Sequence, residues 1–426
     1  MRKRLVDHLR SLVWRRDRHV LASITAGLVG QASVVVSGPL VARALGPEGR
    51  GQLALVIATL IVVVELASLG GASALAYLIP LRELAGRAVL RDHAWWFLGT
   101  ACAAGTLTAL VVVRFVPGHL GLATGALAAS AAAAYLLMRY LLAWIQGERW
   151  FGVLHVARPI PAVFYALGSL LLFTHPSYVG VSTFLGVHLA GSIACIAYVW
   201  WRTRDFSTSG TARLARADLV SFGARSVVGT STPLDSLSLD QVATGALVGT
   251  RALGLYAVGQ SFANLSTFVL QSMGFVVGPR LAVIRDLHER RRLAMRWTAR
   301  ATGTAAAIMV SVQFVLEPLT LLLFGDDFRP SVPLGRVLVV AGMMLSIRKF
   351  LGVLLLGLDR PGAAGLGEGI ALAVFALFAA ILHVSWGVMG LAWALLAAGT
   401  VASLFLFITL VRALPATIDE APGGTS

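Results

Sequence analysis

Long apolar segments alternate along this chain with short glycine-containing turns, and one of these turns occurs twice. The first copy, ARALGPEGRGQLA, spans 42–54, and the second, VGTRALGLYA, spans 248–257. Gly46 aligns with Gly249, and Gly51 with Gly254, at a constant offset of 203 positions. Apolar runs of about 20 residues are long enough to cross a bilayer as helices. The pattern therefore predicts two related halves embedded in a membrane.

The composition favours an integral membrane protein over a soluble one. Hydrophobic residues make up 57% of the chain and charged residues only 13%, whereas a soluble domain carries roughly 25% charged residues. The net charge of +15 would suggest nucleic acid in a soluble protein. Here it is better explained by cationic loops on the cytoplasmic side of a membrane. We therefore expect an all-α integral membrane protein with no nucleic-acid partner.

The apolar segments predict twelve transmembrane helices. The spans are 19–44, 51–78, 93–115, 122–146, 152–173, 180–201, 218–247, 254–279, 299–324, 334–358, 362–384 and 387–411. With the N-terminus inside, 24 Lys and Arg residues fall on the cytoplasmic side and 6 on the outside. This asymmetry predicts that both termini are cytoplasmic, in the inner or plasma membrane.

Six spans precede the polar linker, so both halves begin on the same side. The halves are therefore expected to form a parallel repeat, related by an axis along the membrane normal. The predicted organisation is a basic cytoplasmic N-terminus at 1–18, an N-lobe at 19–201, a cytoplasmic linker at 202–217, a C-lobe at 218–411 and a disordered cytoplasmic tail at 412–426. A cleft between two such lobes is a natural place for a transport substrate.

The segment ARALGPEGRGQLALVIATLIVVVELASLGGASALAYLIP in the first half resembles the opening of polysaccharide-type (Wzx-type) flippases. The block LDSLSLDQVATGALVGTRALGLYAVGQSFANLSTFVLQSMGFVVGPRLA in the second half does so too. These flippases belong to the multidrug/oligosaccharidyl-lipid/polysaccharide exporter superfamily. The resemblance implies a twelve-helix, two-lobe, V-shaped transporter. It also implies outward movement of a polyprenyl-pyrophosphate-linked oligosaccharide by alternating access, for cell-surface polysaccharide biosynthesis.

Basic residues inside the predicted spans are candidates for binding an anionic substrate. A charge near the bilayer centre costs about 2.5–3.5 kcal/mol, so it needs a partner, water or a function. Arg348 and Lys349 lie well inside span ten, whereas Arg139 and Arg225 lie nearer the cytoplasmic ends of their spans. Guanidinium and ammonium groups suit a pyrophosphate. The alternative for Arg139 and Arg225 is that they reach to the interface without contacting substrate.

Acidic and amide side chains inside the spans have two possible roles each. Asp235, Asp240 and Glu65 are candidates for coupling transport to H⁺ or Na⁺, or for neutralising the cavity cations. Gln31, Gln260 and Asn264 are candidate sugar contacts, or they tie helices together. No metal-ligand spacing, nucleotide-binding motif or hydrolase motif occurs in the sequence. We therefore expect no metal, no cofactor and no enzymatic activity.

The leading functional hypothesis is a flippase for a lipid-linked anionic glycan, with membrane lipids and glycan polymerases or glycosyltransferases as candidate partners. The alternative is an ion-coupled multidrug or metabolite antiporter of the same superfamily, which would favour an acidic and aromatic cavity. A membrane glycosyltransferase or polymerase would need a large external loop. The longest predicted external loop, near 325–333, is too short for that role.

Overall fold

The computed structural model describes residues 2–116, 121–206, 214–230, 232–235, 237–284 and 286–414, and every regular element in those ranges is helical. The predicted tail beyond 414 and the centre of the predicted linker, 207–213, lie outside the described residues. The chain divides into two compact units, Met1–Val228 and Gly229–Ser426. The limits predicted for the lobes, linker and terminal segments stay a prediction.

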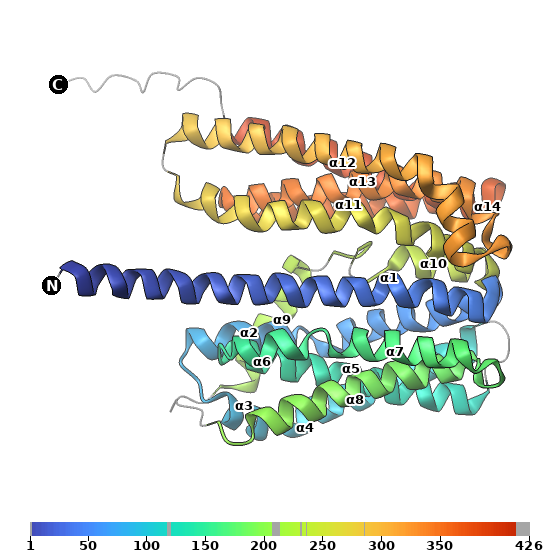
Figure 1. Cartoon of the computed structure of the whole chain (residues 1–426), viewed down its shortest axis with the longest axis horizontal. Coiled ribbons are helices and arrows are strands. Elements are labelled where there is room, and N and C mark those ends of the chain that lie inside the picture. The colour runs from blue at the N-terminus through green and yellow to red at the C-terminus, as the bar shows by residue number, and fades with distance from the viewer. Residues whose placement is uncertain are drawn as a thin grey trace. The chain divides into compact units, whose positions relative to one another are not determined.

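Unit 1 contains long helices that run along the long axis of the view in Figure 1. Its elements are α1 (Arg2–Ser68), α2 (Gly71–Leu81), α3 (Gly86–Asp92), α4 (Ala94–Phe115), α5 (Leu122–Gly147), α6 (Phe151–Ala157), α7 (Ile160–Thr174), η1 (Pro176–Tyr178), α8 (Val181–Thr203) and most of α9 (Arg216–Thr230). Unit 2 follows with α10 (Leu239–Leu247), α11 (Thr250–Val283), α12 (Leu287–Phe324), η2 (Asp326–Phe328), α13 (Ser331–Gly357) and α14 (Pro361–Ala413).

Among the described residues, eight helical segments are long and apolar enough to cross a membrane. Two of them hold two predicted spans each, because α1 is kinked at Gly46 and α14 at Gly387. The eight segments thus account for ten of the twelve predicted spans. The other two, at 218–247 and 254–279, correspond to α9 with α10 and to the less apolar α11. The all-α membrane class is confirmed.

The two copies of the glycine turn adopt similar backbone conformations. Gly46 has φ 66° and ψ 178°, and Gly249 has φ 109° and ψ 170°. A residue with a side chain is strained in this combination of positive φ and extended ψ, whereas glycine adopts it freely. The glycine at each aligned position therefore lets the chain change direction between two helical segments.

Three predicted spans are interrupted, and two of the breaks lie at Pro159 and Pro233, prolines whose position inside a span indicates a kink. The first break, at Leu69 and Gly70, has φ values of 46° and 69°. The second separates α6 from α7 at Pro159, and the third separates α9 from α10 around Pro233. A left-handed residue interrupts a right-handed helix, and proline removes an amide donor from it. Broken helices at membrane depth are tolerated where protein or a water-filled cavity covers them.

Helix α13 is the centre of unit 2, because it packs against α11, α12 and α14. Small residues allow this packing to be close. A Cβ atom on Gly342 would lie 2.6 Å from the carbonyl oxygen of Ala263 on α11. On the opposite side, the Ser403 hydroxyl of α14 donates to the carbonyl of Met344 at 2.8 Å. Such contacts are typical of helix pairs in membranes, and they fix the rotation of α13 about its axis.

The close approach at Gly342 predicts that Gly342→Ala destabilises unit 2 by about 1–3 kcal/mol, because the added methyl group overpacks the contact with Ala263. A fluorescence melting curve of the purified protein in detergent measures this loss. Gly352→Ala is the matched control on the same helix, since its Cβ would meet only the Ala364 methyl at 3.9 Å. Equal melting temperatures for the two variants would contradict the packing described.

Candidate functional site

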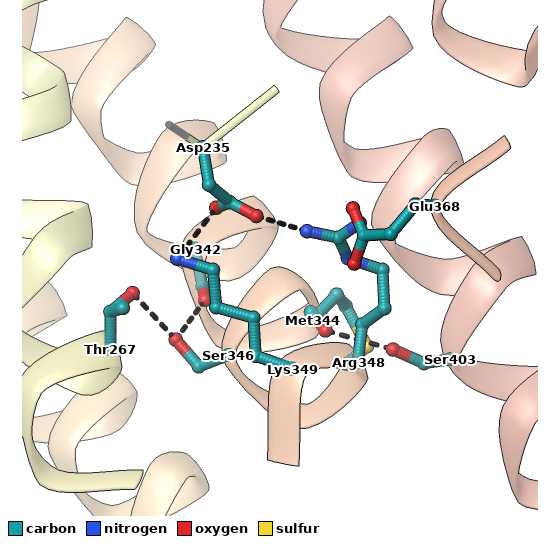
Figure 2. Close-up of polar contacts among 9 residues, drawn as sticks. All are labelled: Asp235, Thr267, Gly342, Met344, Ser346, Arg348, Lys349, Glu368 and Ser403. Carbon is teal, nitrogen blue, oxygen red and sulfur yellow. Dashed lines mark hydrogen bonds and ion pairs between the residues drawn. The ribbon is translucent and has the colours of Figure 1, made fainter. Parts of the chain in front are cut away.

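The cluster of charged side chains in unit 2 centres on Arg348. Its side chain is fully buried on α13. One terminal nitrogen, Nη2, pairs with Oδ2 of Asp235, and the other, Nη1, pairs with Oε2 of Glu368. Figure 2 shows the two carboxylates on either side of the guanidinium group. The planar guanidinium thus bridges two acids from different elements of the chain, with a separate terminal nitrogen for each carboxylate.

Lys349 joins the same cluster through Asp235. Its ammonium nitrogen lies 3.2 Å from Oδ1 of Asp235, so this carboxylate contacts both cations. The Lys349 side chain is 30% exposed. Because neighbouring residues are about 100° apart on a helix, Arg348 is enclosed while Lys349 is accessible at the edge of the cluster.

The break in the seventh span explains how Asp235 reaches α13. Asp235 lies in the turn that follows Pro233, between α9 and α10, and its amide donates to the carbonyl of Thr232 at 3.0 Å. The second acid, Glu368, comes from the first turns of α14. The packing of α14 against α13 brings Glu368 to the arginine, while the turn before α10 brings Asp235 to it.

The cluster is formally neutral, because two cations face two carboxylates. Removing one member of a buried ion pair typically costs about 3–5 kcal/mol, since an uncompensated charge stays behind. The Nε of Arg348 is buried and has no hydrogen-bond partner among the described residues. The guanidinium group therefore has one N–H donor, at Nε, for which the described residues supply no acceptor.

Unit 1 holds a smaller pair of the same kind. Arg139 on α5 pairs through Nη1 with Oε2 of Glu65 on α1. The two side chains are 31% and 20% exposed, respectively. Each unit therefore places an arginine on its fourth predicted span, with a carboxylate beside it. In each unit a cation of the cluster also stays partly accessible.

The remaining candidate residues are spread more widely. Arg225 is exposed on α9, and its Nε donates to the backbone carbonyl of Ser221 at 3.1 Å. Asp240 is buried on α10 and accepts a hydrogen bond from the hydroxyl of Tyr256 at 2.9 Å. Among the described ion pairs, Arg348 contacts Asp235 and Glu368 and not Asp240.

Of the three candidate sugar contacts, Gln31 and Asn264 are exposed on α1 and α11, while Gln260 is partly buried. The Gln260 side-chain oxygen is buried without a hydrogen-bond partner in the described part of the chain. The roles predicted for all these residues stay predictions.

Two polar residues have buried polar atoms that the sequence pattern does not indicate. Tyr256 becomes visible as the partner of Asp240 only once α10 and α11 are placed together. The charge-asymmetry rule assigns Arg50 to an outside loop, yet its Nε is buried beside Tyr165 and has no hydrogen-bond partner in the described ranges. No spacing in the sequence distinguishes either residue. No group of three or more His, Cys, Asp or Glu side chains suited to a metal ion occurs within the described residues.

Comparisons with solved structures show that the fold is similar to that of several membrane transporters. The lipid II flippase MurJ in an inward closed conformation matches with a TM-score of 0.69 and 13% identity, over 92% of this chain and 87% of the flippase. An inward-facing multidrug resistance MATE family transporter of the MOP superfamily matches with a TM-score of 0.67 and 12% identity, over 91% of this chain and 97% of the transporter.

A third similar structure is a MOP superfamily transporter from Pyrococcus furiosus, with a TM-score of 0.61 and 14% identity, over 92% of this chain and 93% of the transporter. Identities this low show the fold alone. No curated protein sequence matches the chain.

The sequence itself matches one family model. The model is described as "Polysaccharide biosynthesis protein" and covers residues 40–333. This region includes both glycine turns, the Arg139 and Glu65 pair, and Asp235. The resemblance to polysaccharide-type flippases is thereby confirmed at the level of the family. Since the match covers well over half of the chain, this multi-span membrane protein belongs to the polysaccharide biosynthesis protein family.

Proposed function

We propose that the protein is a flippase that moves a polyprenyl-pyrophosphate-linked oligosaccharide from the cytoplasmic to the outer leaflet, with both termini in the cytoplasm. The observation that carries the proposal is the accessible cation inside apolar helices of each unit, namely Arg139 in unit 1 and Lys349 in unit 2. Family membership supports a glycan-linked substrate, and similarity to a structure named as a lipid II flippase supports a lipid-linked one.

The cationic groups suit the pyrophosphate in a specific way. In the resting protein, carboxylates neutralise them, so the apolar helices carry no net charge at these points. An incoming pyrophosphate offers Lys349 and Arg348 the same kind of oxygen ligand that Asp235 and Glu368 offer. Substrate binding is therefore an exchange of anions around fixed cations, which avoids the cost of an unpaired charge in the membrane.

The alternative is an ion-coupled multidrug or metabolite antiporter. Similarity to a multidrug resistance transporter and the buried Asp240–Tyr256 hydrogen bond favour it. An antiporter would require an organic cation or metabolite to bind where the flippase binds pyrophosphate. Flipping of a fluorescent polyprenyl-pyrophosphate oligosaccharide in proteoliposomes, compared with efflux of a cationic dye, distinguishes the two.

Lys349→Gln is expected to slow flipping of this labelled lipid by about 10-fold or more, because a charge-assisted hydrogen bond contributes about 1.5–3 kcal/mol. The amount of folded protein should stay near normal, since Lys349 is partly exposed. Arg336→Gln is the matched control, because Arg336 lies on the same helix, is 55% exposed and pairs with Glu317 at 3.8 Å. Equal flipping by the two variants would remove the argument for pyrophosphate binding.

Arg348→Met alone is expected to lower the amount of folded protein strongly, because Asp235 and Glu368 lose their shared cation. The triple substitution Arg348→Met, Asp235→Asn and Glu368→Gln should restore folded protein but not flipping. Size-exclusion chromatography and the proteoliposome assay measure these two properties. Flipping at the wild-type rate by the triple variant would show that the cluster serves only to hold unit 2 together.

The membrane potential is a candidate source of energy for flipping. Moving one elementary charge through 100 mV is worth about 2.3 kcal/mol, which is enough to bias an otherwise equilibrating lipid. Asp235 contacts both cations, whereas Asp240 is hydrogen-bonded to Tyr256. Asp235→Asn should therefore weaken flipping at low membrane potential more than Asp240→Asn does. A flipping rate that is independent of both the pH gradient and the membrane potential would show that these acids only neutralise the cations.

A further inference from the structure

A cavity of about 720 Å³ lies within unit 1, apart from all the charged residues discussed above. Its walls come from α3 and from the ends of α5 and α8, and include Arg87, Arg91, Leu141, Trp200 and Arg204. This volume is within the range of small-molecule and cofactor sites, about 300–1,000 Å³. The proposed flippase mechanism makes no use of it.

Three arginines among the lining residues contribute positive charge to the cavity. Arg87 donates from Nη2 to the backbone carbonyl of Thr203 and so is held in place. Arg91 and Arg204 are 82% and 63% exposed, and each lies near the aspartate that follows it in sequence, at 3.4 and 3.2 Å. Exposed ion pairs of this kind contribute little. Both arginines therefore remain available to a stronger anion.

The rest of the cavity is apolar and aromatic. Leu90 and Leu141 contribute aliphatic walls, while Trp144 and Trp200 contribute indole rings. Trp144 is almost fully buried, and Trp200 is 71% exposed. A free phosphate or nucleotide would leave this apolar surface uncovered, whereas a ligand with a hydrocarbon chain would cover it.

The cavity lies where spanning helices end. Trp144 comes three residues before the last residue of α5, and Trp200 three residues before the last residue of α8. Tryptophan is enriched at the boundary between the bilayer and water, and arginines there attract anionic headgroups. The arginines and the apolar residues of the lining therefore lie near the membrane surface. A phospholipid places its phosphate and the start of its acyl chains at this depth.

We propose that this cavity binds an anionic phospholipid of the surrounding bilayer. Arg87, Arg91 and Arg204 hold its phosphate, and Trp200 and Leu141 pack against its acyl chains. Guanidinium groups recognise phosphate oxygens in a bidentate geometry, which gives the phosphate a defined place. The bound lipid joins α3 to α5 and α8, so it also stabilises this end of unit 1.

Native mass spectrometry of the full-length protein tests the proposal, with dioleoyl-phosphatidylglycerol and dioleoyl-phosphatidylcholine as the two lipids. The wild type should retain phosphatidylglycerol about 10-fold better. Trp200→Ala with Arg204→Gln should lower this retention about fivefold or more, since the variant removes both a charge-assisted hydrogen bond to the phosphate and the indole that packs against the acyl chains. Trp201→Ala with Arg202→Gln is the matched control on the same helix end, outside the lining residues, and should retain the lipid within about twofold of wild type.

Several results would overturn the proposal. One is equal retention of phosphatidylglycerol by the lining and control variants, and another is equal retention of the two lipids by the wild type. A third is glycerol 1-phosphate binding as tightly as the lipid, which would assign the cavity to a free phosphate compound. If the Trp200 variant fails to fold, Arg91→Gln serves instead, because its exposed side chain makes no contact that holds the fold together.

Discussion

A fully buried arginine bridging two carboxylates is the interaction on which the second half of this protein depends. Arg348 is fully buried near the middle of α13, where an isolated charge would be strongly unfavourable. Asp235 and Glu368 make its presence tolerable, and each comes from a different element. The cluster thereby ties the broken seventh span and the eleventh span to α13, in addition to any role in binding substrate.

Close backbone packing is what makes that interaction possible. Glycine and serine along α13 let α11 and α14 approach until hydroxyl groups meet, as in the 2.9 Å contact between Ser346 and Thr267 (Figure 2). Larger side chains at these positions would push the helices apart and separate Arg348 from its carboxylates. The small residues and the buried charge therefore depend on each other. Close packing of the helices positions the charged side chains, and their ion pairs in turn hold the helices together.

Much of the fold could be predicted from the sequence, because apolar length and glycine turns act locally. Gly46 and Gly249 were aligned by spacing alone, and both adopt the positive φ that such a turn needs. Prolines at 159 and 233 indicate two of the helix breaks, whereas no proline marks the break at Leu69 and Gly70, and an apolar run has the same composition whether or not it is continuous. These breaks are important, because the one around Pro233 places Asp235 beside Arg348 and Lys349.

The pairing of charges could not be predicted at all. Sequence position suggested that Arg348, Asp235, Arg139 and Glu65 lie inside the membrane, but not which acid meets which base. Pairing depends on the rotation of each helix about its axis, and contacts such as Gly342 with Ala263 set that rotation. Arg50 illustrates the same limit, since the burial of its Nε beside Tyr165 follows from the packing of α1 against α7.

The central claim is that carboxylates and pyrophosphate compete for the same cations. The most direct measurement is the affinity of the purified protein for a polyprenyl pyrophosphate, by titration calorimetry, in the wild type and in Glu368→Gln. Removing a competing carboxylate should tighten binding by about 10-fold, because Arg348 then has a donor to offer. Unchanged or weaker binding in Glu368→Gln would contradict the account.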